Sequence, residues 1–205
     1  MNNALRNAPM HRGDGVLRSF ARRGWRFGLG SLALSATLVV PVGATGSGNS
    51  AESSGSLLWS SIFKMIAHKW PSVQQLSTAE LAQRIEAHEP VLLIDTRAKS
   101  EYLVSHLPGA VWAESPAQLR DAVLNVPATQ LIVLYCSVGV RSSKAADLLM
   151  RDGGHTVANL RGSIFQWANE GRALEADGRP TAVVHPYNRF FGQLLEPRLR
   201  APGAP

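Results

Sequence analysis

Three short, mostly apolar runs set the fold class of this chain of 205 residues. Residues 91–95, 131–135 and 156–160 are too short for helices, but they have the length and composition of strands buried on both faces. Segments with helical spacing of apolar residues alternate with these runs, and they cover residues 77–88, 115–123, 141–151 and 164–169. The alternation predicts an α/β fold in which helices flank a mostly parallel central sheet on both faces.

The positive charge of the chain is concentrated at its N-terminal end. Residues 1–44 hold six arginines and a single acid, whereas the rest of the chain holds 15 Lys or Arg and 14 Asp or Glu. The formal net charge of +6 therefore belongs almost entirely to the N-terminal segment. Because the remainder is nearly neutral, it lacks the basic surface that nucleic-acid binding needs, and we expect no nucleic-acid partner.

Residues 1–44 have the layout of a secretory signal peptide. An arginine-rich stretch precedes an uncharged run over residues 27–44, which ends in small residues. The pair Arg22-Arg23 resembles the centre of a twin-arginine signal. Cleavage after Ala44 would deliver the mature protein to the bacterial periplasm. Two alternatives stay open. In the first, residues 27–44 anchor the chain in the inner membrane, which is the only case in which we expect a membrane partner. In the second, residues 1–44 are an over-long gene start without a targeting role.

The rest of the chain divides into four parts by composition. Residues 45–56 are rich in Gly and Ser, which predicts a flexible linker. Residues 57–72 predict an amphipathic helix that packs on the domain, and Pro71 is expected to end this helix. The alternative is a helix that binds a membrane surface or a partner. Residues 73–180 form the expected α/β domain, and residues 181–205 form a C-terminal extension that we expect to pack over it.

The only cysteine of the chain, Cys136, directly follows the predicted strand at 131–135. A single cysteine excludes an internal disulfide and a zinc site made of several cysteines. Ligand sites of parallel sheets lie at this end of the strands. A loop with Gly139 and a helix beginning near Arg141 or Ser142 would place backbone N–H groups and positive charge around the thiol, which favours the thiolate and a bound anion. The alternative is that Cys136 is a small buried apolar residue.

Four motifs in chain order resemble those of the rhodanese family of sulfurtransferases. They comprise an Asp-x-Arg strand end, a Glu-Tyr and His-x-Pro-Gly-Ala segment, the cysteine loop, and a Leu-x-Gly…Trp…Gly segment, at residues 92–97, 100–110, 136–141 and 160–171. The loop from Cys136 through Arg141 has the length that sulfurtransferases of the family use, whereas related phosphatases and arsenate-reducing members use a loop one residue longer. The resemblance covers about residues 73–179 and implies the rhodanese-like fold.

The resemblance also implies a sulfur relay in two steps. The thiolate takes a sulfur atom from a small anionic donor such as thiosulfate and becomes a persulfide, and a thiol, cyanide or a sulfur-accepting protein then removes that sulfur. The expected catalytic residues are Cys136 and Arg141. The loop expected to bind substrate and persulfide comprises Ser137, Val138, Gly139, Val140 and Ser142. Asp95 and Arg97 are expected to support this loop, and no metal or organic cofactor is implied.

Several residues qualify this interpretation. Ser142 is expected to cap the helix after the loop, and Glu101 is expected to have a structural role. Ser163 stands where the family often has a second glycine. Ser137 is not basic, which leaves the identity of the donor open. The alternative function is a module that binds an anion or a protein, or senses sulfur, without turnover.

Overall fold

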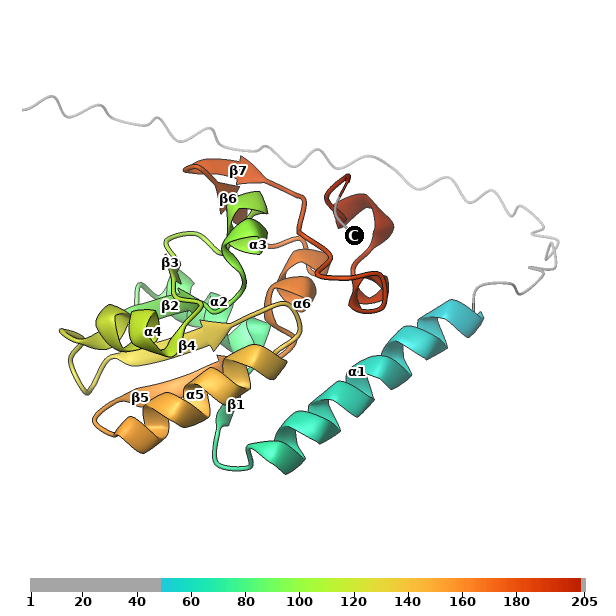
Figure 1. Cartoon of the computed structure of the whole chain (residues 1–205). Helices are drawn as coiled ribbons and strands as arrows, with labels where there is room; N and C mark the ends of the chain where they lie inside the picture. Colours follow the sequence, from blue (N-terminus) through green and yellow to red (C-terminus); the bar gives the residue numbers. More distant parts are fainter. Residues whose placement is uncertain (1–48, 204–205) are drawn as a thin grey trace, which may run out of the picture. The chain divides into compact units, whose positions relative to one another are not determined.

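A five-stranded parallel sheet forms the centre of the computed structural model, which describes residues 49–203 (Figure 1). Its strands are β1 (Gln74–Leu76), β2 (Val91–Asp95), β3 (Val111–Trp112), β4 (Leu131–Tyr135) and β5 (Thr156–Leu160). They lie in the order β1-β5-β4-β2-β3, and every neighbouring pair is parallel. The predicted α/β fold is confirmed, and β4 is its central strand.

Helices cover both faces of the sheet. They are α1 (Asn49–Lys69), α2 (Thr78–Glu86), α3 (Lys99–Val104), α4 (Pro116–Val123), α5 (Val140–Asp152) and α6 (Ser163–Asn169). Residues of α1, α2 and α6 pack with Val133 and Tyr135 on one face, and residues of α4 and α5 pack with Ile132 and Leu134 on the other. Successive side chains of β4 are thus buried on opposite faces, which explains its uninterrupted apolar sequence.

The structure contains short elements that the apolar pattern did not predict. β1 and β3 have only three and two residues and form the two edges of the sheet, so they lack a run long enough to show a period. A hairpin of β6 (Leu174–Ala176) and β7 (Arg179–Thr181) lies outside this sheet. Its turn residues Asp177 and Gly178 both have positive φ, and Asp-Gly is a typical sequence signal for such a turn.

The expected flexible linker at residues 45–56 is wrong from Asn49 onward, where the structure has a helix. Helix α1 begins at Asn49, well before the helix start expected at Leu57. Extension of an existing helix adds residues without a new nucleation cost, and residues 49–56 include a single glycine. Residues 1–48, with the expected signal peptide and the start of the linker, lie outside the described part of the chain. Within the described part, no helix is both long and apolar enough to cross a membrane.

The C-terminal extension packs on the same face of the sheet as α1 and α6. It contains two short 3₁₀ helices, η1 (Phe191–Leu194) and η2 (Pro197–Leu199). The N–H of Val184 donates to the carbonyl of Leu199 at 2.7 Å. The buried side chains of Leu194, Leu195 and Leu199 join the core that α1 and α6 form with the sheet. The extension is therefore an integral part of this core.

Candidate active site

Cys136 opens a loop between β4 and α5 that the start of α6 holds in place. The N–H of Cys136 donates to the hydroxyl of Ser163 at 3.1 Å. In return, the N–H groups of Ile164 and Phe165 donate to the carbonyls of Cys136 and Ser137, at 3.2 and 3.1 Å. Both sides of the cysteine backbone are therefore fixed by a segment that follows the next strand of the sheet.

Gly139 brings the loop back toward the sulfur. Its φ of 104° lies in the left-handed region that favours glycine, and its N–H donates to Sγ of Cys136 at 3.2 Å. A Cβ at this position would lie 3.3 Å from both Asn159 and Ile66. The turn therefore needs glycine for its backbone conformation and has little room for any larger residue.

The surroundings of the Cys136 thiol favour its charged form. Burial raises the pKa of this thiol, but the charge of Arg141 and hydrogen bonds from Ser142 and the backbone of Gly139 outweigh burial, so the pKa lies below its ordinary value. The thiolate is the nucleophilic form of cysteine. Cys136 is also only 1% exposed, so a reactive sulfur is held inside the protein.

Ser142 lies beside the sulfur, but it does not cap α5. The helix begins at Val140, and Gly139, whose backbone is left-handed, takes the N-cap position three residues before the cap expected at Ser142. The hydroxyl of Ser142 lies 2.6 Å from Oδ1 of Asn159, whose amide nitrogen donates to Gln75 at 2.7 Å. The expected capping role is therefore wrong, and Ser142 instead links the loop to β5 and β1.

A carboxylate holds Arg141 at the loop. Both terminal nitrogens of Arg141 donate to Glu101, at 2.6 and 2.8 Å, and one also donates to the hydroxyl of Ser137 at 2.9 Å. That hydroxyl donates to Glu101 at 2.9 Å. Burial raises the pKa of Glu101, but its bonds from Arg141 and Ser137 prevail and lower it. Glu101 is thus ionised and fixes the guanidinium, as a two-point hydrogen bond does.

Asp95 and Arg97 form a buried ion pair beneath this network. Nη2 of Arg97 lies 2.6 Å from the Asp95 carboxylate and also donates to the carbonyl of Ser105. Among the described residues, no hydrogen bond joins this pair to the cysteine loop. The positive charge of Arg97 helps to lower the pKa of Glu101, the carboxylate that holds Arg141. The pair therefore supports the partner of Arg141 and does not contact the thiol.

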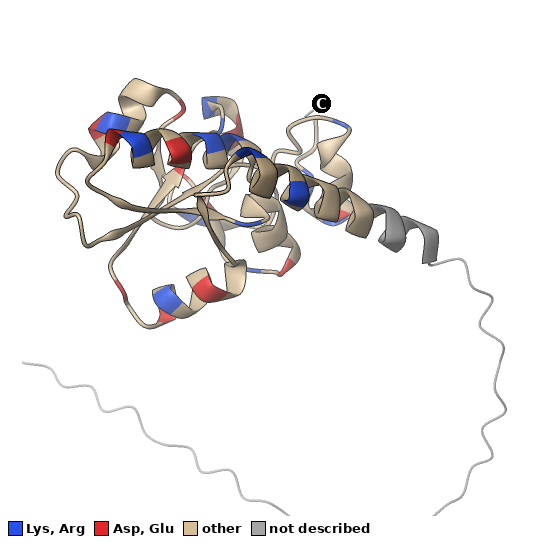
Figure 2. Cartoon of the chain, turned by 90° about the horizontal axis from the view of Figure 1, so that it is seen from below, with Lys and Arg blue, Asp and Glu red and all other residues tan. Residues whose placement is uncertain are grey.

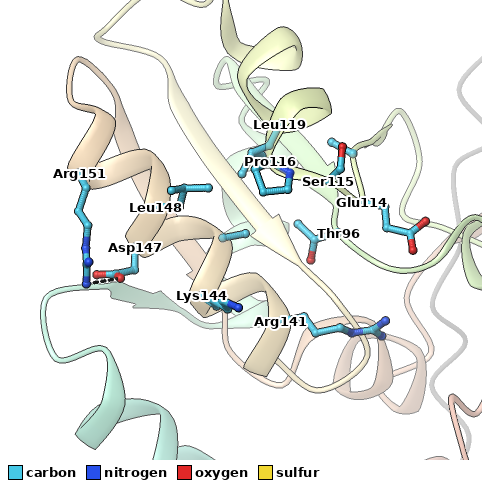
Figure 3. Close-up of a pocket in the computed structure, with 12 residues that line it drawn as sticks. Thr96, Glu114, Ser115, Pro116, Leu119, Arg141, Lys144, Asp147, Leu148 and Arg151 are labelled. Carbon is cyan, nitrogen blue, oxygen red and sulfur yellow. Dashed lines mark ion pairs between the residues drawn. The ribbon is translucent and has the colours of Figure 1, made fainter.

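A pocket of about 550 Å³ opens between α4 and α5 beside the loop (Figure 3). Its walls are largely apolar, and Arg141 and Glu114 lie at one end, whereas the ion pair of Arg151 and Asp147 lies at the other. Lys144 adds a second cation on the Arg141 side. In the described part of the chain, no three His, Cys, Asp or Glu side chains gather in a way that could hold a metal ion.

Sequence reasoning did not find several groups at this site. Glu101 was expected to cap or pair in a structural role, and it accepts from the N–H of Ala98 at the start of α3, at 3.1 Å. Its pairing with Arg141, 40 residues away, was not predicted. Asn159 and Tyr187 were not predicted; the Tyr187 ring lies 4.6 Å from the guanidinium carbon of Arg141. An Asn inside an apolar strand is the one signal that could have indicated a buried polar role at position 159.

The fold and this geometry define a class of α/β domains with a buried cysteine of lowered pKa just after the central parallel strand. A solved structure of a protein from Bacillus halodurans shares the fold, with a TM-score of 0.50 and 20% sequence identity over 68% of this chain and 98% of that one. The family model for the rhodanese-like domain matches residues 77–170. The chain belongs to the rhodanese-like domain family.

Two relatives differ in how much of their length is similar to this chain. A protein named sulfurtransferase from Allochromatium vinosum is 34% identical over 105 residues, which are 51% of this chain and 96% of the relative. A tRNA uridine(34) hydroxylase from Acinetobacter baumannii is 31% identical in an alignment of length 114 that covers 48% of this chain and 36% of that enzyme. The similarity thus spans nearly all of the first protein and about a third of the second.

Proposed function

We propose that this protein is a sulfurtransferase that moves a sulfur atom from thiosulfate, through a persulfide on Cys136, to a small thiophilic acceptor. The observation that carries the proposal is the buried Cys136 thiol, which lies at the start of α5, accepts a hydrogen bond from Gly139 at 3.2 Å and has a lowered pKa. The similarity to the Allochromatium sulfurtransferase supports the same chemistry.

In the first step, the Cys136 thiolate attacks the outer sulfur of thiosulfate. The new S–S bond forms as the S–S bond of thiosulfate breaks, and its electron pair leaves with sulfite. The terminal sulfur of the resulting persulfide carries the negative charge. The N–H groups in the first turn of α5 have no partner within the helix, so they can stabilise that charge.

In the second step, an acceptor such as cyanide attacks the terminal sulfur. The persulfide S–S bond breaks, thiocyanate leaves, and the electron pair returns to Cys136 as thiolate. No net oxidation or reduction of the protein takes place. Because the chain has no second cysteine, the persulfide cannot be resolved to an internal disulfide, and the sulfur must leave to an external acceptor.

The charges around the loop suit an anionic donor. Arg141 is held by Glu101, which offsets part of its charge, and Lys144 lies on the same side of the neighbouring pocket. Elsewhere in the described chain, basic and acidic residues are interspersed along the helices and the segments that join the elements (Figure 2). This distribution supports a small anion as the substrate and gives no support to a nucleic-acid partner.

The experiment is intact-mass analysis of the full chain before and after treatment with thiosulfate. We expect a gain of one sulfur atom, its removal by cyanide with release of thiocyanate, and no gain in Cys136→Ser. A folded, reduced protein that takes up no sulfur from thiosulfate would contradict the proposal. If cells that carry Cys136→Ser kept the phenotype of cells with the unmodified protein, the protein would instead act as a binding module without turnover.

We further propose that residues 1–44 direct export to the periplasm, because they combine an arginine-rich start, an apolar run and small residues at the end. The test follows the mass and the cellular location of the protein in a bacterial host. Cleavage near Ala44 and recovery from the periplasm are expected, and replacement of Arg22-Arg23 by two lysines should block export by the twin-arginine route. Retention of the uncleaved chain in the membrane would favour an anchor.

A further inference from the structure

The C-terminal extension reaches the candidate active site, although it lies outside the segment that matches the rhodanese-like family. Two backbone hydrogen bonds hold its start against its end: Val184 to Leu199 at 2.7 Å, and Ala201 to Val184 at 2.9 Å. Val184 itself is fully buried. In Figure 1 the extension (red) lies on the side of the sheet toward which β4 points. The residues that follow Val184 are therefore held firmly beside the cysteine loop.

Within this extension, Tyr187 adopts a backbone conformation that is unusual for an aromatic residue. Its φ is 66°, in the left-handed region. Its N–H donates to Nδ1 of His185 at 3.0 Å, which helps to hold the turn. Tyr187 is nevertheless 40% exposed, so burial of its ring does not account for the strained backbone. Strain of this kind calls for another role for the side chain.

The ring of Tyr187 covers Arg141. Its centroid lies 4.6 Å from the guanidinium carbon of Arg141, within the range of a cation–π contact. The two terminal nitrogens of that guanidinium are engaged by Glu101 and Ser137, and the ring lies against its central carbon. Tyr187 also contacts Phe191, with ring centroids 5.9 Å apart. The ring is thus fixed between the extension and the site.

This contact lies where the cysteine loop meets solvent. Residues 136–139 are buried, as are Ser142 and Ser143, whereas Val140 and Arg141 are partly exposed. Within the loop, Val140 and Arg141 are thus the residues nearest to solvent, and we take the approach to the sulfur to lie beside them. Tyr187 narrows that approach.

We propose that Tyr187 is a specificity-determining residue that admits small reagents to Cys136 and hinders bulky ones. The restriction of access follows from the geometry alone, and its consequence for sulfur acceptors rests on the proposed sulfurtransferase function. Thiosulfate and cyanide are small enough to pass beside the ring. A peptide thiol is bulkier and would have to displace it.

The test uses Cys136 as the only thiol in the full chain. Alkylation rates are measured with iodoacetamide and with a bulky fluorescein maleimide. In Tyr187→Ala we expect the rate with the maleimide, relative to that with iodoacetamide, to rise about two- to fivefold, the factor that loss of a partly exposed cation–π contact would give. Tyr187→Phe keeps the ring and should resemble the unmodified protein.

Two further variants keep this result interpretable. Tyr187→Gly also removes the ring but relaxes the backbone, so it separates the loss of the ring from any unfolding of the turn and should behave like Tyr187→Ala. Phe190→Ala is the matched control: this residue of the same extension is 56% exposed, and among the described residues Arg141 forms its cation–π contact with Tyr187 and not with Phe190. An unchanged ratio in both ringless variants, or an equal rise in Phe190→Ala, would overturn the proposal.

A second arm measures kcat/KM for glutathione relative to cyanide after loading with thiosulfate. Loss of the ring should raise this ratio. If the unmodified protein forms no persulfide, the sulfurtransferase function fails while the alkylation result still decides the role of Tyr187. If persulfide forms but neither ratio changes, the role of Tyr187 fails alone.

Discussion

The reactivity of Cys136 depends on opposite effects of burial and of Arg141. Burial by itself would keep the thiol neutral, whereas the guanidinium and the hydrogen bonds of the loop favour the thiolate. Because the hydroxyl of Ser142 has one hydrogen, it can donate either to Asn159 or to the sulfur at any moment. We expect it to turn toward the sulfur when the thiolate forms, since the charged group is the stronger acceptor.

The first prediction concerns the pH dependence of Cys136. Because its pKa is lowered, the thiolate should persist to lower pH than in an ordinary cysteine, and the alkylation rate should reach its plateau at correspondingly lower pH. Arg141→Met should move this profile to higher pH, and Arg141→Lys should move it less. Iodoacetamide rates measured against pH provide the check.

The control for this prediction is Arg151→Met on the same helix. Arg151 pairs with Asp147 at the far end of the pocket, so its removal should leave the profile in place. Equal profiles for Arg141→Met and the unmodified protein would show that the charge of Arg141 does not set the pKa of Cys136.

The second prediction concerns Ser163, whose hydroxyl accepts from Cys136 and donates to Leu160 at 3.1 Å. Ser163→Ala leaves the buried Cys136 N–H without a partner, which should cost about 1–3 kcal/mol of unfolding free energy. Since φ of Ser163 is 51°, Ser163→Gly loses the same bond but relieves strain, and it should be more stable than the alanine variant by about 1 kcal/mol. Urea denaturation of both variants tests the order, and a more stable alanine variant would contradict it.

At the scale of single residues, the sequence predicted the loop better than its surroundings. Cys136, Gly139 and Arg141 lie within six consecutive positions, so the turn and the helix that follows bring them together locally. Glu101 and Tyr187 reach the same site through the packing of α3 and of the C-terminal extension. Tertiary contacts of this kind leave no local pattern in a single sequence.

At the scale of elements, burial on both faces decided which strands could be predicted. β2, β4 and β5 are central strands flanked by helices, so nearly every side chain is apolar and the run is visible. β1 reads Gln-Gln-Leu and lies at an edge, where polar side chains reach solvent. The short edge strands therefore follow from pairing with a neighbour and not from their own composition.

The third prediction tests whether α1 belongs to the folded core. Ile66 is 1% exposed and packs in the core with the sheet and α6. Ile66→Ala should lower the unfolding free energy by about 2–5 kcal/mol because it leaves a cavity. Leu57→Ala, on the same helix but 68% exposed, should change it by less than about 0.5 kcal/mol. Equal effects in denaturant titrations would mean that α1 does not contribute this core.

At the scale of the whole molecule, the core extends well beyond the rhodanese-like segment. The family model ends at residue 170, yet the core on the α1 face includes Ile62 before this segment and Leu199 after it. The sequence indicated that both flanking parts exist, but their packing partners depend on the assembled sheet. This dependence explains why the extension had no predicted role at the site.

The fourth prediction follows from this shared core. Deletion of residues 182–205 removes several buried apolar side chains (Val184, Leu194, Leu195 and Leu199). The truncated protein should unfold at lower urea concentration and should be cleaved faster by protease than the full chain, because the core facing α1 and α6 becomes exposed. Deletion of residues 202–205 alone is the control and should have little effect. Equal midpoints for both deletions would contradict an integral extension.

The position of β4 has a consequence for motions within the molecule. As the third of five strands, it is paired on both sides, and opening its hydrogen bonds would require separation of the whole sheet. The extension lies outside the sheet, so the partly exposed turn around Tyr187 can fluctuate locally while its buried anchors Val184 and Leu199, and β4 itself, stay in place. The slowest amide hydrogen exchange should therefore occur in β4, and the region around Tyr187 should exchange faster. The protein thus combines a rigid support for the sulfur with a rim whose local motion is faster than that of the strand beneath it.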